Sequence, residues 1–171
     1  TSYFSLDLRS DFMSLYEKDA AGSDYRTMAY FSESGTGSGT KYRLSKFTDI
    51  YELNNNAANR PADLILGINM IRIPEMYYIA AEALLESDYD RALELYNTVR
   101  THRGLEPLTD KPLTVELIND ERYKEMIGEG QTYFNMKRQN LPILSHEGKT
   151  TYQPSSGIYE IPIPDAEKEN R

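Results

Sequence analysis

The sequence predicts a mainly α-helical fold built on a tetratricopeptide-like helical hairpin, with further C-terminal helices, loop-rich segments and a little β structure. Three observations predict it. Residues 74–86 and 90–102 both carry apolar side chains at helical spacing. Only a short polar joint, residues 87–89, separates them, so the two helices must run antiparallel. The helical pattern continues after residue 114, whereas residues 1–70 are rich in turn-forming residues.

The first helix of the hairpin is expected to begin near Pro74, because proline fits the first helical turn, where its missing N–H group has no partner to lose. Its apolar stripe is predicted to face the core and comprises Met76, Ile79, Ala80, Ala83 and Leu84. Asp88 can cap the second helix, and Gly104 stands where that helix should end. The stripe of the second helix comprises Ala92, Leu95, Tyr96 and Val99.

A third helix is predicted to open at Thr114 and to continue to about Glu129, where two glycines, Gly128 and Gly130, end it. A short helix over Thr132–Gln139 follows. The tail contains two prolines two residues apart, so residues 161–164 should be extended.

The N-terminal region contains weaker signals. We expect a short helix over Ser10–Glu17, a turn over 19–24, and short strands at Met28–Phe31 and Lys41–Phe47. The residues between these strands, 32–40, are small and polar and predict a flexible loop. Residues 1–70 are thus expected to form a loop-rich segment and residues 71–171 a helical region, together in one compact unit.

Composition excludes several classes of function. The 171 residues include no Cys, so disulfides, thiolate metal sites and a Cys nucleophile are excluded. The formal net charge of −8 disfavours nucleic acid as a partner, because an acidic chain repels phosphate. No apolar run has the length of a transmembrane helix. The two histidines, His102 and His146, lack a partner at metal-ligand spacing, and His102 is expected to bond a backbone carbonyl at a helix end.

Two patterns that resemble catalytic motifs do not support catalysis. The Gly-rich residues 35–40 match neither the dinucleotide nor the phosphate-loop pattern. Glu121, Glu125 and Glu129 share one helix face and could supply a carboxylate pair for glycoside hydrolysis. A solvated or ion-paired face is favoured, because Arg122 and Lys124 neutralise the acids locally, with Arg100 and Arg103 as further partners. We therefore predict no enzyme activity, no catalytic residue, no metal and no cofactor.

Aromatic residues beside the N-terminal loops are the candidate ligand-binding residues. Tyr42, Phe47 and Tyr51 flank mobile polar segments, an arrangement that suits stacking on sugar rings. The alternative is that these rings are a small satellite core.

Four blocks, in order, resemble the SusD/RagB family of outer-membrane nutrient-binding lipoproteins. They are the helix of residues 73–83, the Asn-x-Val-Arg signature within 96–105, the segment 118–138, and Ile161–Pro164 with Glu167 and Asn170. Residues 24–26 and 41–47 are similar more weakly.

The resemblance implies non-catalytic binding of a nutrient, most often a glycan, at the cell surface. The ligand would pass to a TonB-dependent outer-membrane transporter. The resemblance also implies that residues 1–70 lie on the ligand side. Family members are longer and carry an N-terminal lipid anchor, so this chain is expected to be a fragment of such a protein. The alternative is a helical-repeat adaptor for protein–protein interaction, which should show at least three tandem repeats.

Overall fold

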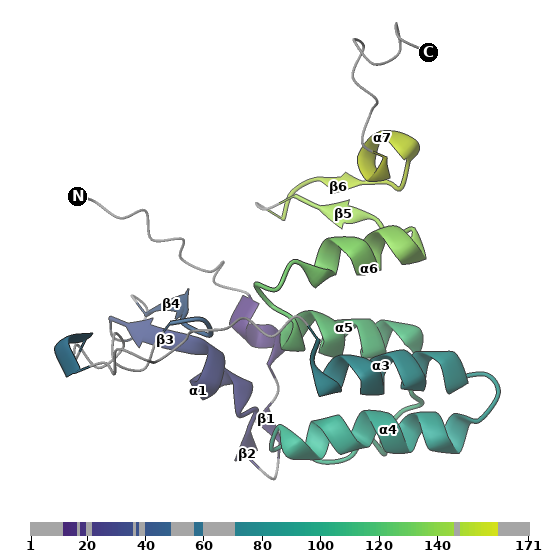
Figure 1. Cartoon of the computed structure of the whole chain (residues 1–171), viewed down its shortest axis with the longest axis horizontal. Coiled ribbons are helices and arrows are strands. Elements are labelled where there is room, and N and C mark those ends of the chain that lie inside the picture. Colours follow the sequence, from purple (N-terminus) through teal and green to yellow (C-terminus); the bar gives the residue numbers. More distant parts are fainter. Residues whose placement is uncertain are drawn as a thin grey trace, which may run out of the picture. The chain divides into compact units, whose positions relative to one another are not determined.

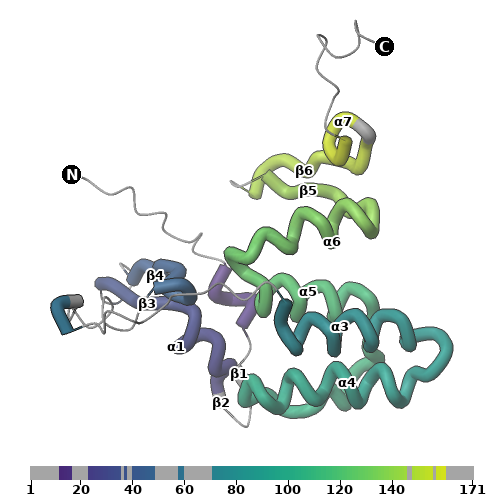
Figure 2. Tube along the Cα trace, in the orientation of Figure 1, coloured from purple at the N-terminus to yellow at the C-terminus, as the bar shows by residue number. Residues whose placement is uncertain are grey.

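The computed structural model describes residues 12–16, 18–19, 22–35, 37, 40–48, 57–59, 71–145 and 148–160. The chain divides into two units, Thr1–Glu125 and Met126–Arg171. Helices dominate and the sheets are small and antiparallel, so the predicted fold class is confirmed (Figures 1 and 2). None of the described helices is both long enough and apolar enough to cross a membrane.

The first unit is built on the predicted hairpin. Helices α3 (Ile73–Leu84) and α4 (Tyr89–His102) lie side by side, and α5 (Val115–Glu125) packs against α3 (Figure 1). The core between them is apolar and well buried. It comprises Tyr78, Ala81, Ala92, Tyr96, Val99, Leu108, Leu113 and Ile118.

The predicted capping residues of the hairpin helices are confirmed. Pro74 lies in the first turn of α3, and the Asp88 carboxylate accepts a hydrogen bond from the Arg91 N–H at 3.2 Å. Helix α4 ends in a Schellman motif, in which Leu105 N–H donates to the Arg100 carbonyl and Gly104 N–H to the Thr101 carbonyl, both at 3.1 Å. Gly104 has φ +79°, a backbone conformation that favours glycine, and a Cβ there would lie 2.5 Å from the exposed Tyr25 ring, which would have to move.

The apolar face of α3 that packs into the core is not the predicted one. Tyr78 and Ala81 are buried, whereas Met76 and Ile79 of the predicted stripe are 45% and 49% exposed and Ala83 is exposed as well. Within that stripe Leu84 does pack against the core. The prediction failed because α3 is apolar on two opposite faces, so periodicity alone could not choose between them. The predicted stripe of α4 is correct.

The N-terminal part of the first unit is a series of short elements. They are the 3₁₀ turn η1 (Phe12–Leu15), strands β1 (Lys18–Asp19) and β2 (Gly22–Ser23), helix α1 (Arg26–Tyr30), strands β3 (Phe31–Ser34) and β4 (Lys41–Leu44), and the 3₁₀ turn η3 (Ala57–Asn59). Strands β1 and β2 pair antiparallel, as do β3 and β4, whose register runs from Phe31 opposite Leu44 to Ser34 opposite Lys41.

Two N-terminal predictions were wrong in part. The strand predicted at Met28–Phe31 is helical up to Tyr30, because the Asp24 side chain accepts from the Arg26 N–H at 3.0 Å and opens a helical turn. The predicted loop 32–40 begins too early, since β3 extends to Ser34. The strand at Lys41–Phe47 is confirmed over its first four residues, and the short helix over Ser10–Glu17 is a single 3₁₀ turn.

The second unit contains α6 (Gln131–Gln139), the paired strands β5 (Ile143–Leu144) and β6 (Thr151–Tyr152), and α7 (Ser156–Tyr159). The predicted helix over 132–139 is confirmed. The third predicted helix ends at Glu125 rather than near Glu129, and residues 126–130 form turns, in which the Glu129 N–H donates to the Met126 carbonyl and Gly128 and Gly130 have positive φ. Residues 161–164 lie outside the described residues, and the division into 1–70 and 71–171 stays a prediction.

Candidate functional site

A buried ionic cluster connects α1 to α5. Arg26 is 1% exposed, and its Nη2 atom lies 2.6 Å from Asp24 Oδ2 and 2.8 Å from Glu121 Oε2. Its Nη1 atom lies 3.5 Å from Glu125 Oε2. We call the side chains of Asp24, Arg26, Arg72, Arg103, Glu121 and Glu125 the Arg26 cluster.

Glu125 is the second hub of the cluster and is fully buried. Its carboxylate accepts from Arg72 at 2.6 Å, from Arg103 at 2.8 and 2.9 Å, and from the Tyr30 hydroxyl at 2.9 Å. Its backbone carbonyl accepts from Lys46 Nζ at 2.7 Å and from Arg72 Nη1 at 2.9 Å. One residue of α5 therefore fixes α1, the start of α3, the end of α4 and the turn after β4.

The partners of Glu125 and Arg26 favour the charged form of both side chains. Burial would raise the pKa of Glu125, but the hydrogen bonds and charges of Arg103, Arg72 and Arg26 lower it to about 2. Burial would lower the pKa of Arg26, but Asp24 and Glu121 raise it above its ordinary value. A general acid for glycoside hydrolysis needs a raised carboxyl pKa. The pKa of Glu125 is lowered instead, so Glu125 is not suited to that role.

The predicted ion-paired face is confirmed for Glu121 and Glu125, whereas Glu129 lies beyond the end of α5 and does not share that face. Arg100 lies 3.6 Å and Lys124 2.5 Å from Glu121, and Arg103 pairs with Glu125 as expected. Arg122 differs from the prediction, because it pairs with Glu82 at 3.0 Å instead. The sequence did not predict that Asp24 and Arg26 belong to this ionic cluster. No spacing signal could have found them, because about a hundred residues separate Arg26 from α5. His102 bonds the Thr98 carbonyl at 2.8 Å, as predicted.

The predicted ligand-binding residues lie on or after β4. Tyr42 is half-buried opposite Glu33, and Phe47 is 44% exposed on the turn Ser45–Thr48. The Lys46 ammonium lies 4.3 Å from the Tyr30 ring centre and 5.7 Å from that of Phe47, so Phe47 projects from a turn that is tied to the buried cluster. Tyr51 lies outside the described residues.

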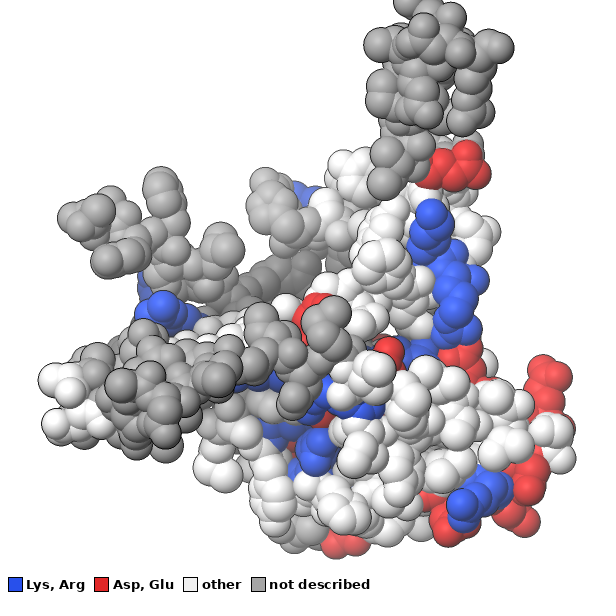
Figure 3. Space-filling model, in the orientation of Figure 1, with Lys and Arg blue, Asp and Glu red and all other residues white. Residues whose placement is uncertain are grey.

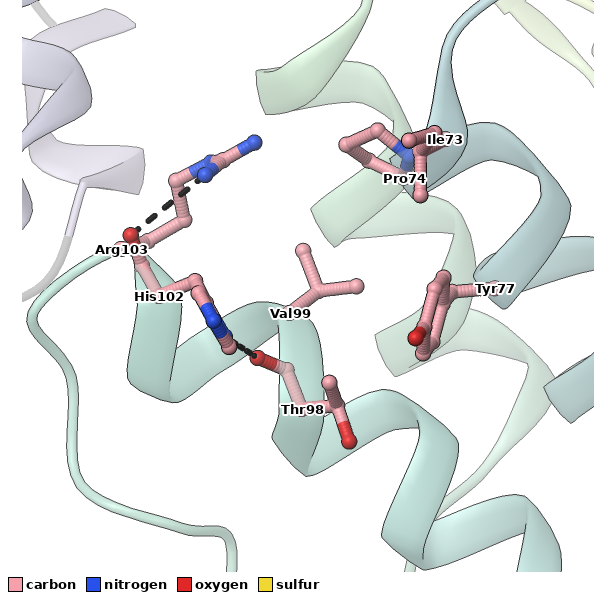
Figure 4. Close-up of a pocket in the computed structure, with 7 residues that line it drawn as sticks. All are labelled: Ile73, Pro74, Tyr77, Thr98, Val99, His102 and Arg103. Carbon is pink, nitrogen blue, oxygen red and sulfur yellow. Dashed lines mark hydrogen bonds between the residues drawn. The ribbon is translucent and has the colours of Figure 1, made fainter.

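A groove that the sequence did not predict lies between α3 and α4 (Figure 4). It has a volume of about 230 Å³ and is mostly apolar. Its α3 wall comes from Ile73, Pro74 and Tyr77, and its α4 wall comes from Thr98, Val99, His102 and Arg103. The Tyr77 ring stands opposite Thr98, and the Val99 side chain points into the gap between the helices (Figure 4).

Among the described residues, no group of three or more His, Cys, Asp or Glu side chains could hold a metal ion.

Comparison with known families identifies the chain. The model of the SusD family matches residues 15–169. The chain belongs to the SusD family. No curated protein matches the sequence.

Two solved structures resemble this SusD-family chain. A SusD-like carbohydrate-binding protein from Bacteroides vulgatus ATCC 8482 is 21% identical with a TM-score of 0.67, covering 98% of this chain and 41% of that one. A SusD superfamily protein from the same organism is 28% identical with a TM-score of 0.49, covering 76% of this chain and 28% of that one. The first likeness supports the fold, and this chain spans less than half the length of either protein.

Proposed function

We propose that this chain is part of a non-catalytic receptor that binds a nutrient, most favourably a glycan, at the cell surface. The receptor delivers its ligand to a TonB-dependent outer-membrane transporter. The observation that carries this proposal is the family match over residues 15–169, supported by the likeness in fold to a carbohydrate-binding protein. The adaptor alternative has less support, since α3–α4 is the one tetratricopeptide-like hairpin in the described part of the chain.

The state of the carboxylates supports a binding role over hydrolysis. Glu121 and Glu125 are buried and paired with Arg26, Arg100 and Arg103, and no solvent-facing pair of these acids is left to flank a sugar bond. Their position on α5 has a structural purpose, because they hold α1 and the hairpin together.

We propose Phe47 and Tyr42 as ligand contacts within this chain. Phe47 presents an aromatic surface to solvent from an anchored turn, so it loses little conformational freedom when a sugar ring stacks on it. Tyr51 is kept as a third candidate from its place in the sequence alone.

The proposal is tested by titration calorimetry of the full-length gene product against a panel of polysaccharides. Binding to at least one glycan is expected, and Phe47→Ala should weaken it about tenfold, roughly 1.4 kcal/mol. Tyr152→Ala, which removes a 52% exposed ring of the second unit, is the matched control and should leave affinity unchanged. Absence of any glycan binding, or release of reducing ends from the glycan, would contradict the function. Binding that Phe47→Ala leaves intact would contradict only the placement of the site.

A second measurement tests whether the receptor delivers its ligand to a TonB-dependent transporter. The full-length product should co-purify from outer membranes with a TonB-dependent transporter. Recovery without any such transporter under conditions that keep membrane complexes intact would contradict the delivery step while leaving ligand binding standing.

A further inference from the structure

A cavity of the first unit that shares no lining residue with the groove between α3 and α4 lies along helix α5. Its volume is about 510 Å³, which is in the range of cavities that bind small molecules. One side is α5 itself, from Leu117 to Lys124. The other sides come from η1, from α4 and from Lys111 in the connection between α4 and α5. We call it the α5 cavity.

The base of the α5 cavity is a buried ion pair. Lys124 Nζ lies 2.5 Å from Glu121 Oε1, and the two residues are 3% and 1% exposed. Arg26 and Arg100 also pair with Glu121, so the negative charge of this carboxylate is already compensated within the protein. Charged residues at the turn end of the hairpin, by contrast, lie on the open surface (Figure 3). The cavity therefore presents fixed, oriented charges to anything that enters it.

Two exposed residues of opposite charge, Lys111 and Asp120, line the mouth of the α5 cavity. Partial burial raises the pKa of the Asp120 carboxyl above its ordinary value, whereas the positive charges of Lys124 and Lys111 oppose the rise. The negative charges of Glu121 and Glu116 add to it. Both ammonium groups therefore lie close enough to the Asp120 carboxylate to act on it.

The rest of the lining that faces these charges is largely apolar. It includes Leu15 of η1, Leu117 of α5 and the ring of Tyr96. Tyr96 is buried in the hairpin core, but Leu15 is 42% exposed and Leu117 is half-buried. An apolar group that covered the two leucines would remove their surface from water, which is favourable. The α5 cavity thus combines a carboxylate, an ammonium group and an apolar wall.

We propose that the α5 cavity binds a free α-amino acid with an apolar side chain. The ammonium group of the ligand pairs with the Asp120 carboxylate. Its carboxylate pairs with the Lys111 ammonium group, and Lys124 adds positive charge from the base. Its side chain packs against Leu15 and Leu117.

Both charges of the ligand are needed, because a ligand with a single charge would cover one group at the mouth without pairing it. Phe47 and Tyr42, the proposed glycan contacts, do not line the α5 cavity. The inference therefore does not depend on glycan binding.

Titration calorimetry of the full-length gene product with leucine tests the proposal. Two analogues isolate the charges: 4-methylpentanoate lacks the amino group of leucine, and 3-methylbutylamine lacks its carboxylate. We expect saturable binding of leucine at neutral pH and binding of each analogue that is weaker by about tenfold or more, since each loses one charge-assisted pair.

Substitutions at the mouth of the cavity locate the site. Asp120→Asn and Lys111→Met each remove one charge from an exposed position, and each should weaken leucine binding by about tenfold. Glu86→Gln and Lys149→Met are the matched controls, because they remove the same charges from exposed positions outside the cavity, and they should leave the affinity unchanged.

Three results would overturn the proposal. The first is the absence of saturable leucine binding. The second is an analogue that binds as tightly as leucine, because the cavity would then not select a ligand with both charges. The third is leucine binding that Asp120→Asn and Lys111→Met leave intact, because the ligand would then bind elsewhere.

Discussion

The centre of the Arg26 cluster, formed by Asp24, Arg26, Glu121 and Glu125, and the core of the α3–α4 hairpin are both buried in the first unit, yet they are built from opposite chemistry. The cluster joins α1 to α5 through charged side chains, with Arg26 at 1% exposure between Asp24 and Glu121. The hairpin core joins consecutive helices through apolar side chains such as Tyr96 and Ile118.

The comparison shows that apolar contacts and buried ion pairs stabilise different kinds of junction. Apolar contacts are non-directional, so they join neighbours whose geometry the short turn already fixes. Buried charges tolerate few arrangements, because each must find its counter-ion. The cluster is therefore suited to fixing α1, which is distant in sequence and only five residues long, in one position.

The largest expected effect comes from removing the central charge of the cluster. Arg26→Met keeps much of the side-chain volume but leaves Asp24 buried without the cation that pairs with it and takes one of three cations from Glu121, so we expect a loss of about 3–5 kcal/mol in urea unfolding. Arg91→Met is the control, since its pair with Glu94 is solvent-exposed, and should leave stability unchanged within error. A loss at Arg26 no larger than that of the control would show that the cluster does not hold the fold.

Acid should weaken the cluster and leave the apolar core unaffected. The pKa of Glu125 is lowered from 4.5 to about 2 in the folded chain, so its contribution is complete above about pH 4.5 and is lost as pH falls toward 2. The loss is on the order of 3 kcal/mol at pH 2. Urea unfolding across this range should show stability falling with pH. Glu125→Gln should flatten that slope, and an unchanged slope would contradict the assignment to Glu125.

Truncation in the hairpin core should cost less than breaking the cluster. Ile118 is fully buried against the hairpin, so Ile118→Ala should lower the unfolding free energy by about 2–4 kcal/mol. Ile79→Ala on the exposed face of α3 removes the same atoms from an exposed site and should have a much smaller effect in the 171-residue chain. Equal losses at the two positions would mean that the assigned core face of α3 is wrong.

The smallest expected effect lies where core and cluster meet. The Tyr78 hydroxyl is buried and has no hydrogen-bond partner among the described residues. Tyr78→Phe removes an unsatisfied polar group and should be neutral or stabilising by up to about 1 kcal/mol in thermal or urea unfolding. A clear destabilisation would show that the hydroxyl has a partner after all.

Local features were predictable from the sequence for local reasons. Pro74, Asp88, Gly104 and Thr114 marked helix ends correctly, because caps depend on a few adjacent residues. The pairing of Arg100 and Arg103 with the acidic face of α5 was also predictable, since opposite charges of neighbouring helices had to be matched. The candidate ligand residues stay predictions, because only binding can test them.

The sequence by itself determined the helical hairpin, its caps and the family, because these depend on short-range periodicity and on blocks of residues in order. Only the tertiary structure decided which face of α3 is buried and that Arg26 reaches α5. A helix that is apolar on two faces carries no local mark of which face meets the core. A buried ion pair between distant segments likewise leaves no spacing pattern, because folding alone brings its partners together.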